Sequence, residues 1–167
     1  MMYMKPVKNL KLKSIWRHYG LFIAGTEAVG ALSGFLTRNG TKMYQAEVIK
    51  PPLNPPAIVF PVVWAILYAL MGTGAAKIWM AKPSKIRTYG LAVFGVQLAM
   101  NFLWSIVFFN LQAYGFAFLW LVGLWILILL MIYLFGRVDK TAGWLQVPYL
   151  IWVTFAGYLN FMVWMLN

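Results

Sequence analysis

Few residues of this chain are suited to acid–base, nucleophilic or metal chemistry. Its 167 residues include one histidine, His18, and three acids, Glu27, Glu47 and Asp139, and cysteine is absent. Without cysteine there is no disulfide, thiolate nucleophile or cysteine-ligated metal. A single histidine cannot supply both axial ligands of a haem within one chain. We therefore expect no catalytic residue, no metal site and no required cofactor.

Aromatic side chains are better candidates, and they favour binding over bond-breaking chemistry. Trp64 and Tyr68 are four residues apart, so they share one face if this segment is helical. Their rings could stack against a flat, conjugated ligand, at about 0.5–1.5 kcal/mol for each good pair. Aromatic residues also form belts at membrane surfaces, and this alternative stays open for the pair.

Two further pairs combine an aromatic ring with a small or polar neighbour. Asn101 precedes Trp104 by three residues in a long apolar stretch, and an amide in such surroundings needs a hydrogen-bonding partner. A neighbouring helix and a ligand are equally suitable partners. Trp152 and Ala156 are four residues apart, and the alanine leaves space beside the indole. This spacing fits either a ligand pocket or ordinary packing of small residues between helices.

The composition indicates which kind of element holds these residues. Hydrophobic residues make up 63% of the chain and charged residues 10%, whereas soluble domains average about 45–50% and about 25%. A soluble protein of this length needs far more polar surface. We therefore predict an integral membrane protein rather than a soluble or disordered one.

Five stretches are long and apolar enough to cross a membrane. Segments 19–37, 57–80 and 144–166 each come close to or exceed the about 20 residues that a spanning helix needs. Arg87 and Arg137 bracket 49 uncharged residues. One helix of that length would measure roughly 73 Å, more than twice the hydrocarbon thickness of about 30 Å, so the stretch must form two helices. The polar residues at 110–112, followed by Gly115, place the break there. The predicted fold is an all-α, five-transmembrane-helix bundle.

The basic residues are unevenly distributed over the two sides of this bundle. Eleven of the 14 lie on the side of the amino terminus, and Arg38, Lys42 and Lys50 lie on the other. Cytoplasmic loops are enriched in Lys and Arg. We expect a basic cytoplasmic segment at 1–18, a membrane domain at 19–167 and the carboxyl terminus outside, in a bacterial cell membrane. The basic side would attract the lipid bilayer's anionic lipids, and no motif for nucleic acid accompanies it.

The connection expected at residues 38–56 ends in a proline-rich run, Pro51, Pro52, Pro55 and Pro56. Proline fixes φ and lacks an amide donor, and the residue before each proline is pushed towards extended geometry. We therefore expect a stiff, non-helical outer loop. It is either a rigid turn or a lid over a cavity.

Short motifs recur in a fixed order along this chain. They are PPLNPP at 51–56, VFP at 59–61, LAMNFLW at 98–104, PYL at 148–150, FA at 155–156 and LN at 159–160. This ordered set, on five spans, resembles the TspO/MBR family of tryptophan-rich sensory proteins and translocator proteins, also called peripheral-type benzodiazepine receptors. The resemblance covers about residues 20–167.

The resemblance implies a five-helix bundle whose ligand cavity opens towards the first loop. It implies a receptor- or transporter-like protein that binds porphyrins, and it implies homodimers. Some members bind cholesterol or benzodiazepine-type drugs. Light- and oxygen-dependent porphyrin degradation is the alternative function. The cavity residues implied in this way are Trp64, Tyr68, Asn101, Trp104, Phe116, Trp152 and Ala156, with Pro51, Pro52, Pro55 and Pro56 as the lid.

Two positions depart from the family pattern. The family's cholesterol motif has a basic residue shortly after an aromatic one, whereas no Lys or Arg follows Tyr158 here, so we do not expect cholesterol binding by that route. Leu53 stands where the family usually has a tryptophan, which makes the lid less aromatic.

Two features of the first span stay open at this point. Glu27 is the one acid inside a predicted span, and such residues are functional candidates by default. Gly30 and Gly34 form a G-x-x-x-G pair that permits a close helix contact, either within the chain or between two copies.

Overall fold

The structure is a computed structural model that describes residues 7–167 and, from Leu12 onward, their side chains. Lys5 of the predicted basic segment lies outside the described residues. Between residues 7 and 167 the chain forms helices and no strand. These are α1 (Val7–Glu47), α2 (Val59–Met80), α3 (Lys85–Ser105), the π-helical η1 (Ile106–Asn110), α4 (Tyr114–Val138), α5 (Lys140–Trp144) and α6 (Val147–Leu166).

Five segments of this part of the chain are long and apolar enough to cross a membrane. They are Leu12–Glu47, Val59–Met80, Lys85–Asn110, Tyr114–Val138 and Lys140–Leu166. Large apolar side chains also cover the outside of the bundle, such as Leu119 at 67% exposure and Ile126 at 56%. Such a surface suits hydrocarbon rather than water, and the predicted five-helix membrane fold is confirmed.

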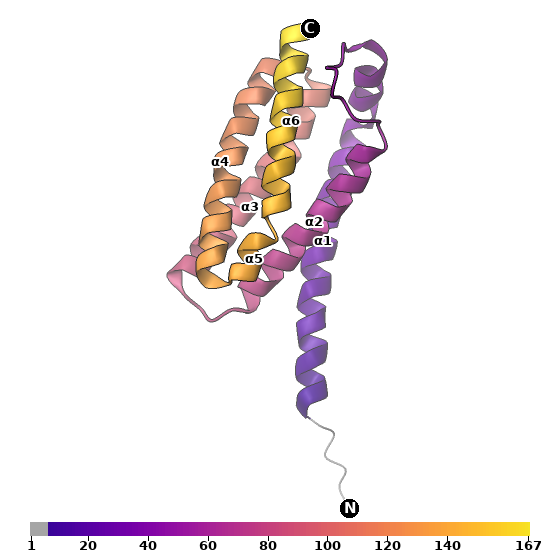
Figure 1. Ribbon diagram of the computed structural model, residues 1–167. Helices are drawn as coiled ribbons and strands as arrows, with labels where there is room; N and C mark the ends of the chain where they lie inside the picture. Colours follow the sequence, from indigo (N-terminus) through magenta and orange to yellow (C-terminus); the bar gives the residue numbers. More distant parts are fainter. Residues whose placement is uncertain (1–6) are drawn as a thin grey trace, which may run out of the picture.

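The five long helices form a bundle, with the start of α1 and the end of α6 at opposite ends (Figure 1). α1 packs along α2, where glycine permits a close approach. A Cβ on Gly72 would lie 2.7 Å from the backbone of Ile23, and the Thr26 hydroxyl donates to the carbonyl of Tyr68 at 2.8 Å. The rings of Phe22 and Trp79 meet at 5.9 Å near the end of α2. The part of α1 before Phe22 therefore extends beyond the bundle.

The outer loop is shorter than the sequence predicts. α1 continues to Glu47, so the prediction of a non-helical connection from residue 38 was wrong for residues 38–47. The polarity of these residues suggested a loop, but packing against η1 favours the helix. The Tyr44 ring lies 5.4 Å from Phe108 and 5.5 Å from Phe109, and a Cβ on Gly40 would strike the Phe109 carbonyl.

The two remaining helix boundaries have local causes. The predicted break between the third and fourth spans is present: η1 ends at Asn110, and Gln112 adopts a φ of 50° before α4 begins. The last span does not begin as one helix at Trp144, because α5 ends there and α6 begins at Val147. Proline at position 148 is tolerated in a first helical turn, but in a continuous helix its ring would clash with the Trp144 carbonyl.

Candidate ligand-binding site

A chain of buried hydrogen bonds joins α2, α3 and α6 in the centre of the bundle. Asn101 Oδ1 accepts from the Tyr68 hydroxyl at 2.8 Å, and Asn101 Nδ2 donates to the Tyr149 hydroxyl at 2.9 Å. The Tyr149 hydroxyl donates to Gln97 Oε1 at 2.9 Å. All four side chains are buried. The neighbouring helices thus supply the partners that the amide of Asn101 requires.

Sequence reasoning missed two members of this chain, Gln97 and Tyr149. A signal for Gln97 exists, since it precedes Asn101 by four residues in an uncharged segment and must share its helix face. Two amides on one buried face indicate a polar layer that other helices must complete. The PYL motif at 148–150 marks the position of Tyr149 but not its role, because its hydroxyl finds its partners only when the bundle brings α6 beside α3.

Trp104 forms a second polar bridge between helices. Its Nε1 donates to Asn160 Oδ1 of α6 at 3.2 Å, and Asn160 Nδ2 donates to the carbonyl of Tyr114 at 2.8 Å. One face of the indole stacks on Phe108, with ring centroids 5.1 Å apart. Trp104 is buried and lies one helical turn beyond Asn101 towards the outer loop.

Aromatic rings of α2 and α6 meet at two levels. Trp64 lies 5.6 Å from Tyr68, as their spacing predicts, and 6.1 Å from Tyr149 of α6. One turn earlier on α2, the Phe60 ring lies edge-on to Trp152 at 5.9 Å. Contacts between α2, α3 and α6 thus involve four of the predicted site residues, Trp64, Tyr68, Asn101 and Trp152. Ala156 packs against the buried core.

We call the rings of Phe60, Trp64, Tyr68, Tyr149 and Trp152 the aromatic group. The Trp152 indole has a feature that the other rings of this group lack. Its Nε1 is fully buried and has no hydrogen-bond partner among the described residues. A buried donor without an acceptor costs about 1–3 kcal/mol. Ala156 follows one turn later and is only partly buried against the core. A polar acceptor placed beside Trp152 would remove this cost.

Phe116 does not join this group, so its predicted place in the cavity is not supported. It is 56% exposed on α4 and packs against Trp120 at 5.8 Å. Trp120 is itself held by a hydrogen bond from its Nε1 to the carbonyl of Met100 at 2.9 Å. The rotation of α4 about its axis, which the sequence does not specify, turns Phe116 outward.

The proline-rich loop, residues 48–58, is attached to both neighbouring helices. The Asn54 amide donates to the carbonyl of Pro51 at 3.0 Å, and the Val59 amide donates to that of Pro56 at 2.9 Å. Pro51 is buried, Pro55 is half-buried, and Pro52 and Pro56 are exposed. Lys50 Nζ donates to the carbonyl of Gln45 at 2.7 Å. The loop is therefore ordered by its own turns and by α1.

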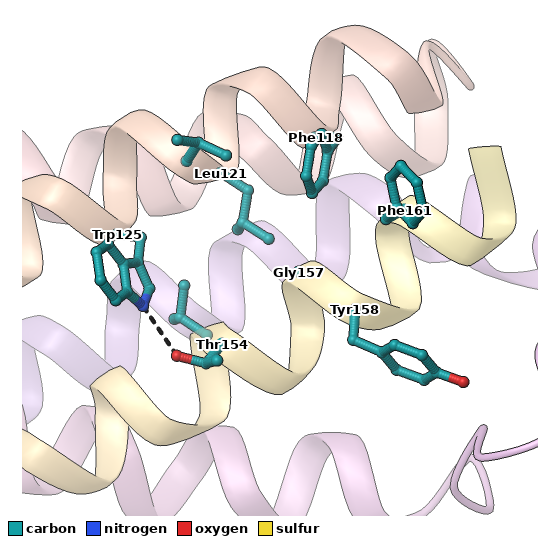
Figure 2. A pocket seen from close by; sticks show the side chains of 9 residues that line it. Phe118, Leu121, Trp125, Thr154, Gly157, Tyr158 and Phe161 are labelled. Atoms are coloured by element: carbon teal, nitrogen blue, oxygen red, sulfur yellow. Dashed lines mark hydrogen bonds between the residues drawn. The ribbon is translucent and has the colours of Figure 1, made fainter. Parts of the chain in front are cut away.

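A separate apolar groove of about 360 Å³ lies between α4 and α6 on the flank of the bundle. Figure 2 shows its lining, with Leu121 and Gly157 at the floor and the Trp125 Nε1 donating to Thr154 Oγ1 at 2.8 Å. None of the predicted ligand-binding residues lines it. Phe161 lines its outer end, and the groove faces the side where lipid would lie.

Of the acidic and basic side chains, Glu27 lies close to Tyr68, between two α1 residues that contact it, Thr26 and Gly30. His18 sits on the extension of α1, where its Nδ1 is 2.7 Å from the carbonyl of Ser14. Glu27 is half-buried on α1 and forms no ion pair within residues 12–167. In the same range no three His, Cys, Asp or Glu side chains come together as a metal site would require. The geometry therefore offers ring faces and an indole donor for a ligand.

The two glycines of the G-x-x-x-G pair have different surroundings. A Cβ on Gly30 would overlap the ring of Tyr68, so this glycine serves a contact within the chain. A Cβ on Gly34 would meet nothing within 4 Å.

Comparison with known proteins identifies relatives of this chain. The model of the TspO/MBR family matches residues 22–165. The tryptophan-rich protein TspO of Chlorobaculum tepidum is 41% identical over 144 residues, which cover 84% of this chain and 89% of that protein. Protein CrtK of Rhodobacter capsulatus is 44% identical over 71% of this chain and 74% of its own length. The translocator protein of Bos taurus is 32% identical over 86% and 88%.

Proposed function

Because this chain belongs to the TspO/MBR family, we propose that it is a receptor- or transporter-like membrane protein that binds porphyrins and related hydrophobic ligands. The ligand would lie between α2, α3 and α6, beneath the proline-rich loop. Ring faces of Trp64 and Trp152 would stack on the macrocycle. Relatives are named as a sensory protein and a translocator protein, and both roles are consistent with such a site.

The observation that carries this proposal is the unpartnered donor of Trp152. A buried N–H between aromatic rings suits a flat apolar ligand that also presents a polar acceptor, such as a carboxylate or carbonyl oxygen. Porphyrins with acidic side chains have both features. The ligand would gain a hydrogen bond there from Trp152 Nε1.

Binding requires the aromatic group to open. The rings of Phe60 and Trp152 are 5.9 Å apart, which is direct contact for an aromatic pair, so no flat ligand fits between them as they stand. Phe60 lies in the first turn of α2, immediately after the proline-rich loop. Movement of this loop would shift Phe60 and expose Trp152, which gives the loop the role of a lid.

We infer the orientation from the distribution of charge. The connection between α2 and α3, the α4–α5 turn and the start of α1 lie at one end of the bundle (Figure 1), and ten of the 13 basic residues within residues 7–167 belong to this end. The positive-inside rule would place it in the cytoplasm of a bacterial cell. The proline-rich loop and the carboxyl terminus would then face outside.

Quenching of tryptophan fluorescence by protoporphyrin tests the proposed site. Ala156→Leu adds bulk beside Trp152, where the ligand would have to enter, so we expect affinity to fall at least about tenfold, which corresponds to about 1.4 kcal/mol. Trp152→Phe keeps a smaller ring but loses the donor, and we expect a milder loss. Ala99→Leu, at an exposed position of α3, is the matched control.

Two outcomes decide the proposal. Unchanged affinity in a folded Ala156→Leu protein would place the site elsewhere. Parallel samples in light and in darkness show whether the porphyrin is consumed, and loss of its absorbance in the light alone would favour the degradation alternative over simple binding.

A further inference from the structure

A second hollow lies at the basic end of the bundle, where α4, α5 and α6 meet. It measures about 190 Å³, which is below the about 300–1,000 Å³ of sites for whole small molecules. We call it the basal hollow, and it is lined by Ile132, Gly136, Lys140, Gly143, Trp144 and Val147. Its size suits part of a larger amphiphile.

Two glycines shape the basal hollow in different ways. A Cβ on Gly143 would lie 2.9 Å from the Gly136 backbone and 3.0 Å from the Ile132 carbonyl, so Gly143 brings α5 against α4. A Cβ on Gly136 would meet no atom within 4 Å. The missing side chain of Gly136 therefore leaves open space at the surface of α4.

Lys140 supplies the charge at the rim of the basal hollow. Within residues 12–167 it forms neither an ion pair nor a side-chain hydrogen bond, and it is exposed. The adjacent Asp139 is already occupied, since its carboxylate lies 3.3 Å from Lys77 Nζ and accepts from the Ala142 amide at 2.9 Å. Lys140 thus remains available to an anion from outside the chain.

The depth of the basal hollow matches the boundary between hydrocarbon and headgroups. The fourth apolar segment ends at Val138 and the fifth begins at Lys140, and Figure 1 places α5 at the end of the bundle. Trp144 is 70% exposed there, as is typical of tryptophans at membrane interfaces. Ile132 and Val147 line the side towards the apolar spans.

From this arrangement we propose that the basal hollow binds one anionic phospholipid. The headgroup phosphate pairs with Lys140 beside the Trp144 indole, and the first part of an acyl chain lies over Gly136, against Ile132 and Val147. A neutral headgroup lacks the charge that Lys140 selects, and a soluble phosphate lacks the chain that the apolar lining selects. This site is independent of the porphyrin proposal.

Native mass spectrometry of the detergent-solubilised protein tests this proposal, with phosphatidylglycerol and phosphatidylcholine of identical acyl chains as probes. We expect one phosphatidylglycerol to be retained in preference to phosphatidylcholine. Lys140→Gln should reduce this preference about fivefold, the effect of one lysine near an anionic surface. Gly136→Leu, whose Cβ would meet no atom within 4 Å, should fill the hollow and remove the bound lipid.

Matched controls separate the site from general effects of charge and bulk. Lys82→Gln removes an exposed cation at the same end, and Gly95→Leu adds a side chain to an open position of α3; both should bind as the unmodified protein does. Equal binding of the two lipids, or equal losses in variants and controls, would overturn the proposal. So would displacement of the lipid by soluble glycerophosphoglycerol at the same concentration.

Discussion

Ile49 and Asn167 are 118 residues apart in sequence and exchange two hydrogen bonds. The Ile49 amide donates to Asn167 Oδ1 at 3.0 Å, and Asn167 Nδ2 donates to the Ile49 carbonyl at 3.1 Å. This pair fastens the start of the proline-rich loop to the outer end of α6. If the loop opens at the Ile49 end, both hydrogen bonds must break.

We predict that Asn167→Ala loosens the loop without unfolding the bundle. Hydrogen exchange at the Ile49 amide should become faster, because this amide loses its only acceptor among the described residues. Protoporphyrin should also dissociate faster if the loop is the lid. Asn39→Ala, at an exposed position of α1, should change neither rate, and unchanged exchange at Ile49 in Asn167→Ala would contradict the fastening role.

The two glycines of α1 should respond differently to alanine. Gly30→Ala places a methyl group against the ring of Tyr68, which is held by its hydrogen bond to Asn101, so we expect a destabilisation of about 1–3 kcal/mol from overpacking. Gly34→Ala meets open space and should be neutral or slightly stabilising in a helix. Thermal unfolding in detergent measures both. Equal melting temperatures would show that Tyr68 moves aside freely.

Asn101 should matter more for stability than its single hydrogen bonds suggest. Asn101→Leu leaves the hydroxyl of Tyr68 without its acceptor and deprives the Tyr149 hydroxyl of its donor, so we expect a loss of about 1–3 kcal/mol. Adding Tyr68→Phe removes the orphaned hydroxyl and should recover part of this loss. If the double variant is as unstable as the sum of the single variants, the two side chains are not coupled.

Asp139 should contribute to stability in a pH-dependent way. Burial alone would raise its pKa, but the hydrogen bond from the Ala142 amide and the nearby Lys77 ammonium lower the pKa below its ordinary value. A folded-state pKa below the unfolded one means that the ionised carboxylate stabilises the fold at higher pH. This contribution is lost as the pH falls below about 4 and through the folded-state pKa.

Melting temperatures between neutral and acidic pH test this dependence. Asp139→Asn should flatten the acidic fall of the melting temperature relative to the unmodified protein. Glu47→Gln changes an exposed acid at the end of α1, far from Asp139 in sequence, and its melting temperature should fall in acid as that of the unmodified protein does. If the melting temperature of Asp139→Asn changes with pH in the same way as that of the unmodified protein, the Lys77 contact has no energetic role.

The inferred orientation predicts which introduced cysteines are accessible from outside the cell. The native chain has no cysteine, so labelling has no background. Leu53→Cys, at a position that is 65% exposed in the outer loop, should react with an impermeant maleimide on intact cells. Lys13→Cys should react only after permeabilisation, and the reverse pattern would invert the topology.

The sequence by itself determined the class of protein, the number of spans and the main break between them. These properties depend on local composition, because a helix in hydrocarbon satisfies its own backbone hydrogen bonds and needs only sufficient apolar length. The stretch without charge between Arg87 and Arg137 is too long for one helix, and the polar residues at 110–112 located its division. The shared face of Trp64 and Tyr68 followed from the helical repeat.

Only the tertiary structure decided how these helices are rotated and where their polar groups meet. The bond between Asn101 and Tyr149 joins residues 48 positions apart, and no local pattern determines that pairing. The continuation of α1 to Glu47 depends on the contact of Tyr44 with Phe108 and Phe109. Phe116 faces outward because α4 presents another face to α3 and α6. Each of these outcomes depends on packing between distant segments, which a one-dimensional pattern does not contain.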